Sequence, residues 1–221
     1  MLEDLANNTE AGASPEAPAS SAKTRFKGVA ICGSHPETKM QAPFSDAGWV
    51  VYSCSPDNSP HGLNPGHCSP LPRVDQAFEI HDPVFDRSRP YAYLDWLRNI
   101  PVVWMRDQVA MAMTINGTPL FPTARLYPEK EMKARFGLFT FTSSIAFMMA
   151  KAIVDIEALR AQGQMIEQPQ LGLWGILQRS KQEYEAQRQG TQNMIHEATK
   201  AGIKVLASAK SGLFEPPPEV F

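Results

Sequence analysis

Short β-branched or aromatic runs alternate with helical segments through the middle of the chain. Residues 28–32 (GVAIC) are apolar throughout and stop at a glycine, which is typical of a strand buried on both faces. Further strands are predicted at 49–54, 74–81, 102–105, 171–176 and 203–206, and helices at 91–99, 142–159 and 191–201. This alternation predicts an α/β fold: a Rossmann-like, mainly parallel sheet with helices on both faces, in a single domain.

The long segment 107–135 shows no periodicity strong enough to predict an element. Loops of this length are uncommon in compact domains. We therefore expect either a functional lid or short elements that the pattern does not reveal.

The two ends differ in composition from the middle. Residues 1–23 are rich in Ala, Ser, Pro, Asn and Glu, with almost nothing to anchor them in a core, which predicts a disordered leader. Residues 214–221 carry three consecutive prolines and form a predicted Pro-rich tail. The Rossmann-like domain is thus expected over 24–213.

Charge and cysteine content narrow the function class. The chain of 221 residues has 21 basic and 23 acidic residues, so it lacks the basic excess of a protein that binds nucleic acid tightly. Three cysteines do not resemble a disulfide framework, and no apolar run is long enough to span a bilayer. We expect a cytoplasmic protein, in the host cytoplasm if viral, without membrane contact. Both a monomer and a homo-oligomer fit the sequence.

Polar residues follow several predicted strands, where ligands of open α/β sheets bind. The first strand ends at Gly33-Ser34, whose backbone and hydroxyl can approach phosphate or ribose; a plain turn is the alternative. The second ends with Ser53 and Ser55. His81 ends the third, where it can act as acid or base or make a structural hydrogen bond.

Two later segments add candidate ligand groups. Thr142, Ser143 and Ser144 open the apolar helix at 142–159, where free amides and hydroxyls can bind an anion or simply cap the helix. The stretch 181–190 follows a core strand and is dense in polar groups that either contact a ligand or form a solvated helix face.

The sequence gives little indication of a metal site or of a serine hydrolase. Cys54, His61, His67 and Cys68 lie within fifteen residues, but their spacing matches no zinc-binding pair. No G-x-S-x-G elbow is present for a serine hydrolase. We expect neither a bound metal nor a cofactor.

The order of Gly33-Ser34, the polar end at Ser53, Thr142-Ser143-Ser144 and the run Leu173-Trp174-Gly175-Ile176 resembles the Rossmann-like superfamily of bacterial sialyltransferases of glycosyltransferase family 42 and related phage and bacterial proteins. The resemblance covers about residues 27–215. It implies a nucleotide-sugar-dependent glycosyltransferase, phage-encoded in one version of this interpretation, with a nucleotide or nucleotide sugar as its partner.

The resemblance also implies roles for individual residues. The family's catalytic histidine falls near Gln187 or Arg188, where this chain has none. His81, Glu183 and Glu185 are the candidate catalytic bases. The candidate nucleotide-binding residues are Gly33, Ser34, Ser53, Ser55, Thr142, Ser143, Ser144, Tyr184 and Arg188. The alternative hypothesis is a non-catalytic nucleotide-binding or interaction protein that kept the fold and lost the base.

Overall fold

The computed structural model describes residues 25–54, 71–80, 91–106, 108–178 and 183–214. The leader expected at 1–23 and the tail expected at 214–221, apart from Phe214, lie outside these ranges. So do His61, His67 and Cys68 of the disfavoured zinc cluster.

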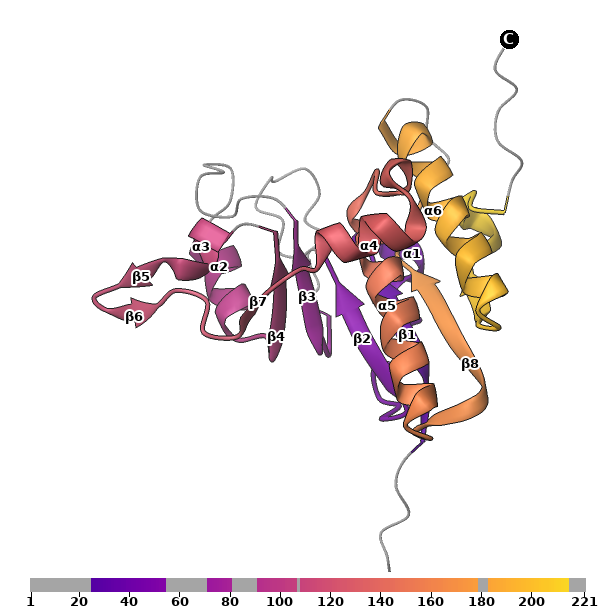
Figure 1. The fold of residues 1–221 in the computed structure, drawn as a ribbon, viewed down its shortest axis with the longest axis horizontal. Coiled ribbons are helices and arrows are strands. Elements are labelled where there is room, and N and C mark those ends of the chain that lie inside the picture. The colour runs from indigo at the N-terminus through magenta and orange to yellow at the C-terminus, as the bar shows by residue number, and fades with distance from the viewer. Residues whose placement is uncertain (1–24, 55–70, 81–90, 107, 179–182, 215–221) are drawn as a thin grey trace, which may run out of the picture.

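Seven strands form one parallel sheet, which confirms the predicted Rossmann-like α/β fold (Figure 1). Across the sheet the order is β7-β4-β3-β2-β1-β8-β9. The chain therefore adds strands outward on one side of β1 and then returns to the other side with β8. The seven strands are β1 (Phe26–Cys32), β2 (Trp49–Ser53), β3 (Gln76–Glu79), β4 (Val102–Met105), β7 (Ala124–Leu126), β8 (Met165–Trp174) and β9 (Lys204–Ala207).

The sheet is covered on both faces, as the continuous apolar run at residues 28–32 predicts. Phe78 of β3 packs in the cluster under α5, whereas its neighbour Ala77 packs against α2 on the opposite face. In β1, Ile31 and Cys32 divide between the two faces in the same way, and both are fully buried.

Helices α5 and α6 pack side by side on one face, with α5 crossing in front of β1 in Figure 1. The α5 residues 145–150 are buried in succession, so this helix has almost no polar face over that stretch. The predicted helix at 142–159 is therefore confirmed as a core element. The helices are α1 (Pro36–Lys39), α2 (Tyr91–Arg98), α3 (Gln108–Ala112), α4 (Glu129–Phe136), α5 (Ser144–Ala161) and α6 (Glu183–Lys200), with 3-10 turns η2 (Leu138–Thr140) and η3 (Ala209–Ser211).

The segment 107–135 contains short elements: α3, the hairpin β5 (Thr114–Ile115) and β6 (Thr118–Pro119), β7 and α4. Asn116 and Gly117 form the hairpin turn with φ of 52° and 79°, the conformation that an Asn-Gly pair favours. The hairpin projects from the sheet in Figure 1 and its strand residues are exposed. Two-residue strands are too short to produce a detectable period.

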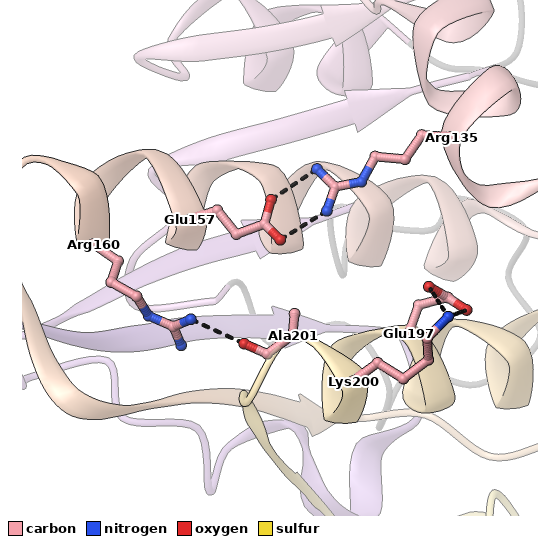
Figure 2. Close-up of polar contacts among 6 residues, drawn as sticks. All are labelled: Arg135, Glu157, Arg160, Glu197, Lys200 and Ala201. Atoms are coloured by element: carbon pink, nitrogen blue, oxygen red, sulfur yellow. Dashed lines mark hydrogen bonds and ion pairs between the residues drawn. The ribbon is translucent and has the colours of Figure 1, made fainter.

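Charged side chains join α4, α5 and α6 on their outer surface (Figure 2). Arg135 of α4 makes a bidentate pair with Glu157 of α5, with both N···O distances at 2.7 Å. Arg160 of α5 donates to the carbonyl of Ala201, where α6 ends, at 2.9 Å. None of the helices in the described ranges combines the length and apolarity needed to cross a bilayer.

Candidate functional site

The strand order reverses between β1 and β8, and the connections from these two strands leave toward opposite faces. After β1 the chain passes through Ala42, which packs beside Ala30 and Cys32. After β8 it enters α6, whose Met194 packs with Ile31 on the other face. In open parallel sheets, this reversal at the carboxyl edge is where ligands bind.

Backbone hydrogen bonds hold the loops after β1 and β8 together at this reversal. The amide of Gly33 donates to the Trp174 carbonyl, and that of His35 donates to the Gly175 carbonyl, both at 2.8 Å. The Gly175 amide in turn donates to Thr38 Oγ1 at 2.8 Å. The backbone amides of Gly33 and His35, which were expected to face a ligand, thus donate to carbonyls at the end of β8 instead.

Glycine is required at both positions of this contact. A Cβ on Gly33 would lie 2.4 Å from the Gly175 carbonyl oxygen, and a Cβ on Gly175 would lie 2.6 Å from that of Gly33. Gly175 also has φ of +64°, in the left-handed region. Beside this contact the Ser34 side chain is exposed and His35 is half-buried.

The structure describes one of the two candidate serines at the end of the second strand. Ser53 is fully buried, and its hydroxyl donates to the Cys32 carbonyl at 3.2 Å. This bond gives Ser53 a structural role between β1 and β2. Ser55 and the candidate base His81 lie outside the described residues.

The polar residues before α5 cap that helix and join it to α6. Ser143 is the N-cap, and its hydroxyl accepts from the Ala146 amide at 3.3 Å. Thr142 Oγ1 donates to the Gln187 carbonyl of α6 at 3.2 Å. Ser144 is half-buried in the first turn of α5. The capping interpretation therefore holds for Ser143.

The stretch after β8 forms the beginning of α6. Glu183, Tyr184 and Glu185 lie in its first turn, and the directions of their side chains are not described. Arg188 is 7% exposed. Gly190 fits closely against the segment before α5, since a Cβ there would lie 2.2 Å from Thr142 Oγ1. This part of α6 is a packed face, not a uniformly solvated one.

Two buried polar residues at the carboxyl edge were not singled out from the sequence. Lys39 ends α1 and is 2% exposed, with its Cβ only 2.8 Å from where a Cβ on Gly175 would lie. Gln178 follows β8 by four residues and is also 2% exposed, and its backbone N–H donates to the Ser211 carbonyl. The sequence does contain a lysine seven residues after the end of the first strand, whereas nothing local marks Gln178.

Two ionisable groups near this edge have pKa values shifted by their surroundings. Burial, with a smaller contribution from the nearby Cys54, raises the pKa of the Cys32 thiol to about 12, so it is protonated at neutral pH. Arg106, just after β4, pairs with Glu129 through N···O distances of 2.5 and 2.8 Å. Burial raises the pKa of Glu129, but the hydrogen bonds and charges of Arg106 and Lys133 outweigh it and leave that pKa below its ordinary value.

The described part of the chain holds no group of three or more His, Cys, Asp or Glu side chains placed to bind a metal ion. At the carboxyl edge, polar groups of the loops after β1 and β8 bond to one another. Separately, polar groups join the segment before α5 to α6. Comparison with known proteins adds no assignment: no protein-family model, curated protein or solved structure matches this chain significantly.

Proposed function

We propose that this protein binds a nucleotide or nucleotide sugar at the carboxyl edge of its sheet and transfers the sugar to an acceptor. The observation that carries the binding step is the reversal of strand order between β1 and β8. Parallel sheets of this kind bind ligands outside the carboxyl ends of their strands at such a reversal. The transfer step rests on the resemblance to family 42 sialyltransferases.

Several features of this edge suit a phosphorylated ligand. Ser34 presents an exposed hydroxyl beside the rigid Gly33–Gly175 contact. The buried Lys39 brings a cation to the same loop pair. The 18-residue helix α5 starts at the carboxyl edge, and the dipole of a long helix favours an anion near its N-terminus.

In glycosyl transfer, the bond between the anomeric carbon and the phosphate oxygen breaks while a bond to the acceptor oxygen forms. A base takes the proton of the acceptor hydroxyl, and the nucleotide departs with the bonding electrons. Glu183, Glu185 and His81 are the proposed bases.

The second candidate function is nucleotide binding without turnover. It is favoured by the hydroxyls of Ser53, Thr142 and Ser143, which are all bonded to protein atoms. These groups stabilise the fold without needing a ligand. The chain also lacks a histidine where the family has its catalytic one.

A thermal-shift series with nucleoside monophosphates and nucleotide sugars tests the binding step. A ligand at a hundred times its Kd stabilises the fold by about 2.7 kcal/mol, which is a clear rise in Tm for a domain of this size. Ser34→Glu places a negative charge beside the proposed phosphate and is expected to abolish the shift. Ser45→Glu adds the same charge to another exposed serine, in the loop before β2, and is expected to preserve it.

Two results contradict the proposal: no shift with any nucleotide, or equal shifts in the Ser34 and Ser45 variants. Where binding is found, release of free nucleotide from a nucleotide sugar separates the two candidate functions. Transfer or hydrolysis of the sugar supports the enzyme, and binding without release supports the non-catalytic protein.

A further inference from the structure

Gln178 lies at the carboxyl edge, close to the proposed nucleotide site. The segment from Gly175 to Gln178 begins against the β1 loop, where the Ile176 side chain reaches within 3.1 Å of the position a Cβ on Gly33 would occupy. It ends against η3, where the backbone N–H of Gln178 donates to the Ser211 carbonyl at 2.9 Å. Gln178 therefore lies in the loop that leaves β8, one of the two strands between which the strand order reverses.

The carboxamide oxygen of Gln178 is buried and has no hydrogen-bond partner among the residues that the structure describes. The whole residue is 2% exposed. A buried amide oxygen normally accepts at least one hydrogen bond, because losing water without replacement destabilises the fold. The fully buried Ser53 illustrates the rule, since its hydroxyl donates to the Cys32 carbonyl.

We propose that Gln178 contacts the nucleotide and that its Oε1 accepts a hydrogen bond from an uncharged donor of that ligand, an N–H of the base or a ribose hydroxyl. This inference rests on the proposed function and extends it to a residue that selects the ligand. The terminal torsion of glutamine is broad, so the carboxamide can turn toward the donor without a change of rotamer. An amide oxygen accepts only, so a ligand without a donor at this point is disfavoured.

The stability of the free protein provides the first test. Gln178→Met keeps the length of the side chain and removes the acceptor, and Gln178→Leu does the same with a different shape. If the oxygen has no partner in the free chain, at least one of these variants melts at or above the wild-type Tm, because removing an unsatisfied buried polar group relieves its desolvation cost. A lower Tm in both variants means that the oxygen is already bonded, and overturns the inference.

Nucleotide affinity provides the second test, measured by calorimetry with CMP, UMP and their 2′-deoxy forms. We expect the Gln178→Met variant to bind about tenfold more weakly than wild type, the scale of one hydrogen bond. The control is Gln168→Met, an exposed glutamine nearer the start of β8, which is expected to bind as wild type does.

The panel of ligands separates the sources of the donor. A loss for CMP and its deoxy form, but not for the uridine pair, identifies the cytosine amine. A loss for both ribonucleotides but neither deoxynucleotide identifies the 2′-hydroxyl. Unchanged affinity of the variant for every nucleotide that wild type binds overturns the inference and leaves the proposed function standing. Failure of wild type to bind any of them removes the proposed function itself, and with it this inference.

Discussion

At the scale of single residues, the geometry of the carboxyl edge depends on two glycines at positions where a side chain would not fit. Gly33 and Gly175 face each other so closely that a methyl group on either would meet the other's carbonyl. Ser53 closes the neighbouring strand pair by bonding to the Cys32 carbonyl. These residues set the positions of the loops that the proposed ligand would contact.

Gly33→Ala is expected to destabilise the protein by about 1–3 kcal/mol, the usual cost of overpacking a close backbone contact. Urea denaturation measures this change. Gly48→Ala is the control, because the atoms nearest to a Cβ there are side-chain atoms of Asp46 and Lys27 at 3.1 Å or more, and these can move. Equal stability losses in the two variants would contradict the role given to the Gly33–Gly175 contact.

The buried thiol of Cys32 gives a second prediction at this scale. Its pKa is raised to about 12, mainly by burial, so the folded chain stays protonated there above pH 9 while the unfolded chain ionises. The stability associated with this thiol is full below pH 9 and falls progressively as the pH rises to about 12. Cys32 should therefore resist alkylation at pH 8 until the chain unfolds. Peptide mass spectrometry checks this, and rapid labelling of Cys32 in the folded protein would refute it.

At the scale of elements, one face of the sheet is held by three helices joined through side chains and caps. Arg135 and Glu157 join α4 to α5, while Arg160 joins α5 to the end of α6 (Figure 2). Gly190 lets α6 approach the segment before α5. The middle of α6 is therefore fixed against the segment before α5, and its carboxyl end is fixed against α5.

Arg160→Ala is expected to lower the free energy of unfolding by about 0.5–1.5 kcal/mol. The guanidinium donates to the carbonyls of Ala201 and Gly202, which are left without helical partners where α6 ends. Arg160→Lys keeps the charge and loses the paired donors, so it should recover only part of the loss. Denaturant unfolding of the two variants is the measurement, and wild-type stability in Arg160→Ala would contradict this account of the α6 end.

The elements that sequence patterns predicted best are those with continuous apolar runs. The strand at 102–105 and the core of the helix at 142–159 were placed closely, because their apolar runs are continuous. β8 begins six residues earlier than expected, since Glu167, Gln168 and Pro169 resemble a loop when read locally. α6 starts eight residues earlier, because its first turns are polar. In both cases tertiary contacts outweigh the local signal.

At the scale of the whole molecule, the parallel sheet was predictable and its strand order was not. Alternating strands and helices indicate a parallel sheet, but the placement of β8 beside β1 is fixed by contacts between residues far apart in the chain. The sequence likewise indicated Gly33 and Ser34 as strand-end residues. It could not show that the Trp174 and Gly175 carbonyls would accept from the Gly33 and His35 amides, or that Gln178 would be buried against η3.

The central claim is that a nucleotide binds at the carboxyl edge between β1 and β8. Hydrogen exchange of the full chain, with and without the nucleotide that gives the largest thermal shift, tests it most directly. We predict slower exchange in peptides covering residues 33–38, 142–147 and 174–178, and unchanged exchange in the loop at 162–164, which precedes β8 at the amino edge. Protection confined to regions away from the carboxyl edge, or none at a saturating nucleotide concentration, would contradict the account.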